Sequence, residues 1–253
     1  MQKLPLITII TVVYNGETCI EQTIKSVISQ TFKNIQYIII DGLSTDNTIN
    51  LINKYKANID RIVSEQDNGL FDAMNKGIHY ANGKWINFLN CGDTYYSSTV
   101  IEQIFKNYHT DNVDLIYGDV CLLKKSKIQK TRKSKKINKI WRGMPFCHQC
   151  AFYKTEVLKK YKFRNELGAD FFQLYSLYKK DYKIHKIDLC IANYLPGGLS
   201  EINRYKINKK QFRLIKEDQH GLFLFFLYMY YFLKITINTV KYKINMLINY
   251  LSI

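Results

Sequence analysis

The chain has 253 residues, of which 47% are hydrophobic and 14% aromatic, and this composition excludes a protein that is disordered over most of its length. Its formal net charge of +16 predicts an anionic partner: a phosphorylated small molecule, an acidic membrane surface or nucleic acid. The six cysteines lack the spacing of a disulfide-linked secreted domain, and the apolar start is too short for a signal peptide. We therefore expect a cytoplasmic protein.

The first hundred residues alternate between strand and helix patterns. Strands are expected at residues 6–13, 36–41, 61–64 and 84–90, and helices at residues 17–29, 46–57 and 70–80. This order predicts an α/β fold with a Rossmann-like, mostly parallel sheet flanked by helices. Ligands of such sheets bind beyond the carboxyl ends of the strands, where Tyr14, Asp41, Glu65 and Asp93 fall. These four polar positions predict a binding site at that edge.

The pattern continues less regularly after residue 100. Strands are expected at residues 114–120, 150–153 and 183–194, and helices at residues 155–161 and 170–180. Between them lies a strongly basic stretch, residues 124–139. It is either a solvated loop between two elements or a patch that faces phosphate or lipid.

The C-terminal region has a different character. Residues 222–233 are twelve consecutive apolar or aromatic side chains, followed by Lys234. A membrane-spanning helix needs about twenty such residues, so we expect this run to be too short to cross a bilayer. Its tyrosines and the neighbouring lysines suit a membrane interface, and the alternative is a helix that packs in the core or in a homodimer.

Two polar motifs in the first half follow expected strands. In DGLSTDNT, residues 41–48, a carboxylate at Asp41 could accept the imide N–H of uracil, whereas Asp46 and Thr48 are the short oxygen side chains that begin a helix. In SEQDNGLFDAMNKG, residues 64–77, apolar positions 71, 74 and 78 form the packed face of a helix. Asp72 and Asn75 share another face, directed along the strand ends.

An ordered set of motifs spans residues 5–200: TVVYNG, DGLSTDNT, SEQDNGLFDAMNKG, FLNCGD, IYGD, CHQ, GADF and GGLS. Each motif is common, but the set in this order resembles the family 2 glycosyltransferases of the GT-A fold, and most closely the bacterial group that builds O-antigen, capsule and colanic acid. The resemblance implies that residues 1–100 bind a nucleotide sugar and residues 101–200 bind the acceptor. Residues 201–253 would form a helical, apolar and basic extension.

The resemblance also assigns roles to individual residues. Asp93 would be the metal ligand for Mn²⁺ or Mg²⁺, and one carboxylate is enough because such ions take few protein ligands when a diphosphate supplies the others. Asp170 would be the catalytic base, although an ordinary acid at a helix N-terminus is the alternative. The nucleotide would contact Thr11, Tyr14, Asn15, Asp41, Glu65, Asp67 and Asn75. The acceptor or the diphosphate would contact Asp119, His148, Gln149, Gly198 and Ser200.

The implied activity is that of an inverting, metal-dependent glycosyltransferase. It would transfer a sugar, such as galactose or glucose, from a UDP-sugar to a saccharide on a polyprenyl diphosphate, at the inner face of the bacterial plasma membrane. The alternative is a non-catalytic nucleotide- or RNA-binding module. No sequence motif of the common RNA-binding modules occurs, so we expect no nucleic-acid partner.

Overall fold

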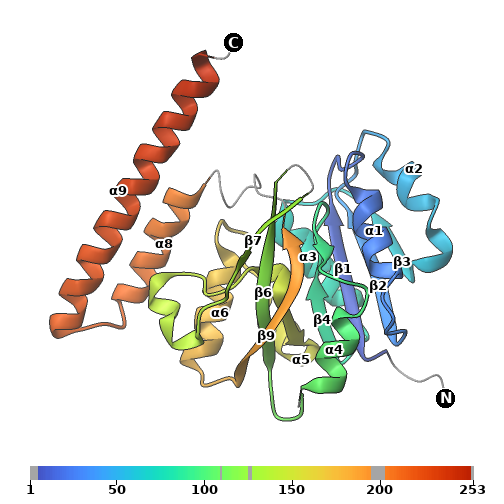
Figure 1. Cartoon of the computed structure of the whole chain (residues 1–253), viewed down its shortest axis with the longest axis horizontal. Coiled ribbons are helices and arrows are strands. Elements are labelled where there is room, and N and C mark those ends of the chain that lie inside the picture. Colours follow the sequence, from blue (N-terminus) through green and yellow to red (C-terminus); the bar gives the residue numbers. More distant parts are fainter. Residues whose placement is uncertain (1–4, 109, 125–126, 195–202, 252–253) are drawn as a thin grey trace.

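Among the described residues, a nine-stranded mixed sheet is the centre of the computed structural model (Figure 1), in the order β3-β2-β1-β4-β8-β6-β9-β5, with β7 paired to β6. The described residues are 5–108, 110–124, 127–194 and 203–251. The strands are β1 Ile7–Val13, β2 Ile35–Asp41, β3 Arg61–Ser64, β4 Trp85–Phe88, β5 Thr94–Tyr95, β6 Leu115–Lys124, β7 Lys127–Arg132, β8 Ala151–Lys154 and β9 Ile184–Tyr194. Strands β1 to β4 are all parallel, whereas β8 runs antiparallel between β4 and β6. The expected α/β sheet is confirmed for its first half, and it is mixed beyond β4.

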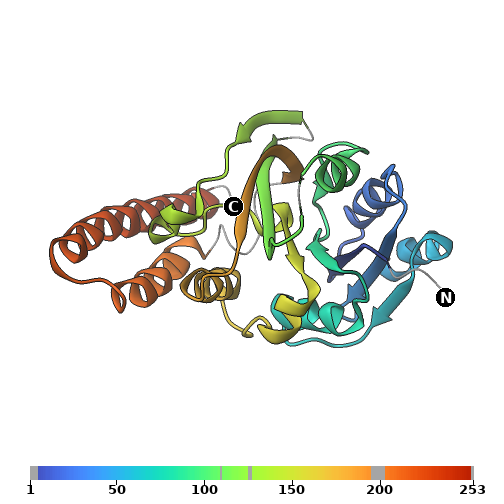
Figure 2. The ribbon, with the colours of Figure 1, turned by 90° about the horizontal axis from the view of Figure 1, so that it is seen from below.

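Helices cover both faces of this sheet. They are α1 Ile20–Ile28, α2 Thr48–Asn53, α3 Leu70–Tyr80, α4 Val100–Asn107, α5 Thr155–Lys160, α6 Ala169–Lys179, α8 Arg204–Lys216 and α9 Gly221–Leu251, with 3-10 turns η1 Lys56–Asn58, η2 Ile137–Arg142 and η3 His148–Cys150. Figure 2 shows α1 and α4 on one face and α3, α5 and α6 on the other. Strand β1 contributes side chains to the hydrophobic core on both faces of the sheet. Ile10 and Val12 belong to one buried cluster, and Ile9 and Val13 belong to the other.

The register of the first three strands aligns their carboxyl ends. Val13 lies opposite Asp41, and Asp41 lies opposite Ser64. The chain beyond β4 continues along β1, because Cys91 N–H donates to the Val12 carbonyl at 3.2 Å. The loops that follow these four strands therefore leave the sheet at one edge.

The basic stretch at residues 124–139 differs from the loop that we considered. It contains β7, which pairs antiparallel with the outer part of β6, and then η2. Strand β6 pairs with β8 only through Tyr117, so the rest of that edge has backbone groups that β7 satisfies. We did not predict this strand from the sequence, because lysine is less frequent in strands than apolar residues are.

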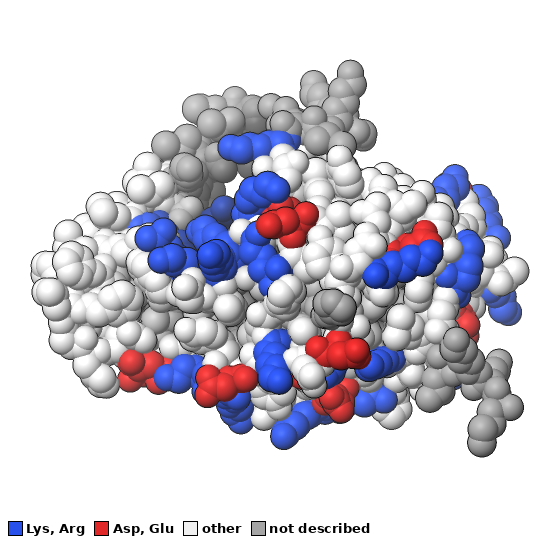
Figure 3. Space-filling view, turned by 60° about the horizontal axis from the view of Figure 1, so that its bottom comes forward, with Lys and Arg blue, Asp and Glu red and all other residues white. Residues whose placement is uncertain are grey.

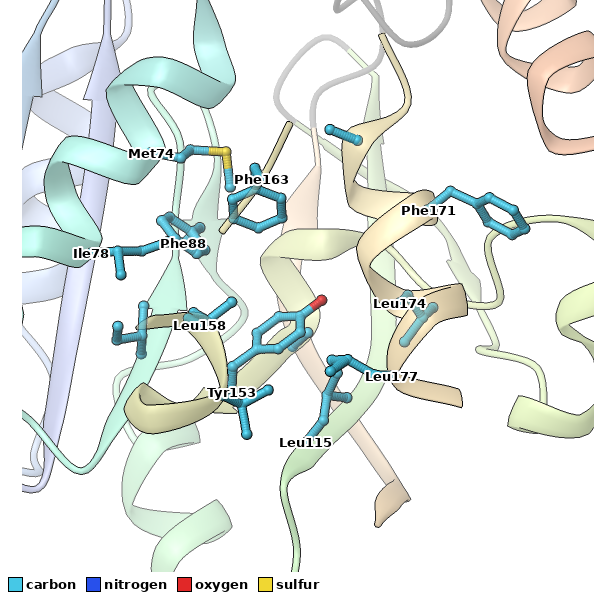
Figure 4. Packing of buried hydrophobic residues seen from close by; sticks show 14 of the residues in the cluster. Met74, Ile78, Phe88, Leu115, Tyr153, Leu158, Phe163, Phe171, Leu174 and Leu177 are labelled. Atoms are coloured by element: carbon cyan, nitrogen blue, oxygen red, sulfur yellow. The ribbon is translucent and has the colours of Figure 1, made fainter. Parts of the chain in front are cut away.

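Helix α6 is held by apolar side chains that connect the two halves of the sheet (Figure 4). Phe171, Leu174 and Leu177 are buried in the same cluster as Tyr153 of β8 and Leu115 of β6. Burying a side chain of this size contributes about 1.5–3 kcal/mol, so the start of α6 is fixed relative to the sheet.

The C-terminal helix α9 is longer than the apolar run suggested. Its segment Gly221–Val240 has 20 residues with a mean hydropathy of 1.4, so by length and composition it is long enough to cross a membrane, contrary to our expectation. One side of α9 is docked on the protein. Phe212 of α8 contacts Tyr231, Trp141 of η2 contacts Phe223, and Lys234 Nζ donates to the Arg142 carbonyl at 2.7 Å.

Candidate active site

The loops after β1 and β2 are tied to each other by backbone-to-side-chain hydrogen bonds. The Asn15 N–H donates to Ser44 Oγ at 2.8 Å, and the Thr45 N–H donates to Asn15 Oδ1 at 2.9 Å. The Gly16 N–H donates to Thr48 Oγ1 at 2.8 Å. Asn15 adopts a φ of 49°, a conformation that asparagine tolerates better than most residues. Tyr14, next to Asn15 in the chain, has 64% of its surface exposed.

Asp41 ends β2 and is fully buried. Its Oδ2 accepts hydrogen bonds from Ser64 Oγ at 2.6 Å and from the Ser44 N–H at 3.1 Å, and Ser44 Oγ donates to Oδ1. The carboxylate therefore fixes the β2 and β3 ends. In this arrangement it does not reach the surface, so a contact between Asp41 and a base requires the Ser44 loop to move.

Four of the other residues expected at the nucleotide also have contacts within the protein. Thr11 is fully buried, and its hydroxyl donates to the Leu89 carbonyl at 2.8 Å, which is a structural role. Asn75 pairs twice with the backbone of Phe163, at 2.8 and 3.0 Å, and so joins α3 to the second half of the chain. Glu65 forms an ion pair with Lys76 at 2.9 Å. Asp67 Oδ1 accepts the Gly69 N–H at 2.8 Å, ahead of α3.

The FLNCGD motif ends in a tight turn that a side chain of α1, Thr23, holds by hydrogen bonds. Gly92 has a φ of 96°, which favours glycine, and its N–H donates to Thr23 Oγ1 at 3.0 Å. The same hydroxyl donates to the Asp93 carbonyl at 2.9 Å. Asp93 is 7% exposed. Within the described residues, no group of three or more His, Cys, Asp and Glu side chains is placed to hold a metal ion, so this turn suits only a cation that a diphosphate helps to bind.

His148 comes from the short turn η3 and lies against the FLNCGD turn. Its Nε2 is 2.8 Å from Asn90 Nδ2. Burial lowers the pKa of His148, and the charge of Asp170 opposes that shift only in part. With the Asn90 amide as donor, Nε2 is the acceptor and the proton of the neutral ring is on Nδ1. Sequence reasoning missed this pairing because nothing local links Asn90 to His148.

Asp170 is the second residue of α6, whose N-cap is Gly168 with a φ of 85°. The side chain is half-buried, and its Oδ1 accepts the Phe171 N–H at 2.9 Å. The negative charge of Asp170 acts to raise the pKa of both His148 and Cys147, and the charge of Asp93 acts in the same direction on the pKa of Cys147. The fold thus brings Asp93, His148 and Asp170 into one electrostatic neighbourhood.

The remaining expected site residues lie elsewhere or are buried. Asp119 is 1% exposed, accepts the N–H and hydroxyl of Ser134 at 2.8 and 3.0 Å, and pairs with Lys133 at 2.8 Å. In this structure Asp119 therefore holds the basic stretch in place. Gln149 is buried beside His148, and its Nε2 has no partner among the described residues. Gly198 and Ser200 lie outside the described residues.

Cys91 of the FLNCGD motif lies against a second thiol, Cys19. Cys19 Sγ and Cys91 Sγ are 3.1 Å apart, and the hydrogen bond from Cys91 lowers the pKa of Cys19 to about 7, from 9.0. We expect iodoacetamide to alkylate Cys19 with half its maximal rate near pH 7, because the thiolate is the nucleophile. Cys91→Ala should move that midpoint toward pH 9, whereas Cys91→Ser keeps a donor and should move it less. A parent midpoint near pH 9, measured by mass spectrometry, would contradict this.

The fold of this chain is that of the GT-A glycosyltransferases. The structure is similar to a mannosyltransferase from Pyrobaculum calidifontis in complex with GDP-Man and Mn²⁺, with a TM-score of 0.69 and 15% identity, covering 94% of this chain and 74% of that one. It is also similar to S. aureus TarS in complex with UDP-GlcNAc, with a TM-score of 0.64 and 16% identity, covering 82% of this chain. The matched part is 65% of that TarS chain. Identities this low show the fold alone, which is a GT-A fold.

The chain belongs to glycosyl transferase family 2, whose family model matches residues 8–168. It is 27% identical to a PGL/p-HBAD biosynthesis glycosyltransferase of Mycobacterium bovis, over 78% of this chain and 79% of that protein. It is 37% identical, over 45% of each chain, to the Escherichia coli UDP-Glc:alpha-D-GlcNAc-diphosphoundecaprenol beta-1,3-glucosyltransferase WfaP. The protein is therefore a glycosyltransferase.

Proposed function

We propose that this protein transfers a sugar from a UDP-sugar, a hexose such as glucose or galactose, to a saccharide carried on a polyprenyl diphosphate, in the synthesis of a bacterial O-antigen or capsule. The observation that carries this proposal is the convergence of Asp93, His148 and Asp170 beside the carboxyl ends of β1 to β4. The E. coli relative supports the donor and acceptor classes, since its name specifies UDP-Glc and a diphosphoundecaprenol-linked sugar. Residues 1–100 bind the nucleotide sugar in this proposal, and residues 101–200 bind the acceptor.

The chemistry follows from the proposed roles of these side chains. Asp170 accepts the proton of the acceptor hydroxyl as that oxygen attacks the anomeric carbon from the face opposite the nucleotide, so the configuration inverts. Neutral His148 offers its Nδ1–H to the acceptor or to the diphosphate. Asp93 would hold Mn²⁺ or Mg²⁺, which when bound neutralises charge on the departing nucleoside diphosphate.

A donor screen tests the proposal. The purified protein is incubated with a panel of UDP- and GDP-sugars, Mn²⁺ and a short-chain prenyl-diphosphate saccharide, and the products are separated by chromatography. We expect transfer or slow hydrolysis with at least one UDP-sugar. No turnover with any donor, together with nucleotide binding, would favour a non-catalytic nucleotide-binding module.

We also propose that α9 lies on the inner face of the plasma membrane. Its undocked side exposes large apolar side chains, among them Phe225, Phe226 and Phe232 at 60, 58 and 66%. In Figure 3 the α8–α9 end of the molecule is largely white, and Lys and Arg side chains gather beside it. Apolar side chains next to cations match the interface of an anionic bilayer. Because α9 is also docked through Trp141 and Lys234, lying along the surface fits better than crossing it.

The triple substitution Phe225→Ser, Phe226→Ser and Phe232→Ser should release the protein from vesicles that contain phosphatidylglycerol, because it removes apolar surface but no docking contact with η2 or α8. Co-sedimentation measures the bound fraction. The matched control is Tyr96→Ser, an exposed aromatic residue 45% accessible near β5, which should leave binding unchanged. Equal sedimentation of the triple variant and the parent would assign α9 to another contact.

A further inference from the structure

Charge balance at the site calls for a cation from the protein. The side chains gathered there include two carboxylates, Asp93 and Asp170, and a histidine whose lowered pKa makes it neutral at pH 7. A nucleoside diphosphate brings at least two more negative charges and gains another when it leaves the sugar. One divalent ion at Asp93 cannot offset all of this. An arginine is suited to the remainder because its planar fork binds phosphate oxygens in pairs.

Arg132 occupies the required place. It ends β7, opposite Val120 of β6, and its Nη2 donates to Cys147 Sγ, immediately before His148. Arg132 is exposed, and the thiol that it contacts is half-buried in the site wall. A thiol is a weak hydrogen-bond acceptor, so this contact leaves the guanidinium poorly satisfied, and phosphate oxygens would bind it more strongly.

The segment after Arg132 is anchored at several points, which makes its position a property of the fold. Asp119, buried in β6, accepts Ser134 through two hydrogen bonds and pairs with Lys133. The Lys135 N–H donates to the Pro145 carbonyl at 2.8 Å, and Tyr117 donates to the Lys135 carbonyl at 2.8 Å. The basic stretch is thus held against the loop that carries Cys147 and His148, and it is not a freely solvated run.

We propose that Arg132 binds the diphosphate of the nucleotide donor and stabilises the leaving group, and that Asp119 is the positioning residue that holds the Arg132 segment in place. This inference rests on the proposed function. In this proposal the basic stretch has two roles. Arg132 supplies a cation for the diphosphate, and its neighbours Lys133 and Ser134 hold the segment in place through their contacts with Asp119.

Calorimetric titration with UDP and with uridine tests the role of Arg132, in EDTA and again with Mg²⁺. Arg132→Gln should weaken UDP binding about 10–100-fold in both conditions, the scale of a hydrogen bond to a charged group, and change uridine binding less than about twofold. Lys139→Gln, in the same basic stretch, removes the same charge and should leave UDP binding within about twofold. Arg132→Lys should fall between Arg132→Gln and the parent because it keeps the charge without the fork.

Equal losses in Arg132→Gln and Lys139→Gln would reduce the effect to general electrostatics and overturn the proposal, as would unchanged UDP affinity in Arg132→Gln. A parent protein that binds neither UDP nor GDP would overturn the proposed function together with this inference. The two failures are distinguishable, because only failure of the proposed function abolishes nucleotide binding by the parent protein.

A double-mutant cycle tests the positioning role of Asp119. Asp119→Asn should weaken UDP binding in the same direction as Arg132→Gln, and the two together should lose little more than Arg132→Gln alone. Fully additive losses would mean that Asp119 does not act through Arg132. Ser134→Ala, a milder change in the same clamp, replaces Asp119→Asn in the cycle if the latter lowers the melting temperature substantially.

Discussion

Asp170→Asn should lower turnover about 10²–10⁴-fold, because the amide keeps the size of the side chain but cannot accept the proton of the acceptor hydroxyl. Nucleotide affinity should change little, since Asp170 belongs to the start of α6 and not to the loops after β1 and β2. The measurement pairs steady-state turnover with a UDP titration on the same preparation. Loss of both turnover and UDP binding would indicate a damaged fold, which a lowered melting temperature would reveal.

Glu166→Gln is the matched control for this prediction. Glu166 is an acid on the same approach to α6, and it pairs with Lys210 at 2.8 Å, away from the sheet edge. Its substitution should leave turnover within about twofold, as is usual for partly exposed ion pairs. Near-normal turnover in Asp170→Asn would exclude it as the base. Asp119 would not take its place, because Asp119 is buried and contacts Lys133 and Ser134.

The parts of the fold that the sequence predicted well are those specified by local patterns. Helix α3 spans Leu70–Tyr80, the expected residues, because its apolar positions and the preceding Gly69 act within one segment. Strands β1 and β2 are near-continuous apolar runs whose side chains are buried on both faces of the sheet. Strand β7 was not expected, because it depends on the unpaired edge of β6, a feature of the sheet and not of its own residues.

The site shows the same division. The motifs indicated which strand ends carry polar side chains, and the register aligns those of β1 to β3. They did not indicate that Asn75 would bind the Phe163 backbone, that Asp119 would pair with Lys133, or that Asn90 would meet His148. Each of these contacts joins residues far apart in the chain. An acid or amide in a motif is equally compatible with binding a ligand and with satisfying buried backbone, and only the packed structure distinguishes the two.

Asp93→Ala should lower turnover at least about 10²-fold, the scale of losing one preorganised electrostatic group at the leaving group. EDTA should abolish turnover in the parent, and Mn²⁺ or Mg²⁺ should restore it. The structure gives a reason for this dependence: within the described residues no group of three or more His, Cys, Asp and Glu side chains is placed to hold a metal ion by itself. The diphosphate must then complete the coordination, so metal and nucleotide should each strengthen the binding of the other.

Titration of UDP with and without Mg²⁺ measures that coupling directly. The parent should bind UDP more tightly with the metal, whereas Asp93→Asn should bind it equally in both conditions, with an affinity close to that of the parent in EDTA. Asp111→Asn removes an acid from an exposed loop and should keep the full metal effect. Full parental activity in EDTA would exclude a requirement for a metal ion. An unaltered effect of Mg²⁺ on UDP binding in Asp93→Asn would show that Asp93 is not the metal ligand. The turn held by Thr23 fixes the Asp93 backbone, so Thr23→Val should reduce the metal effect without removing the carboxylate.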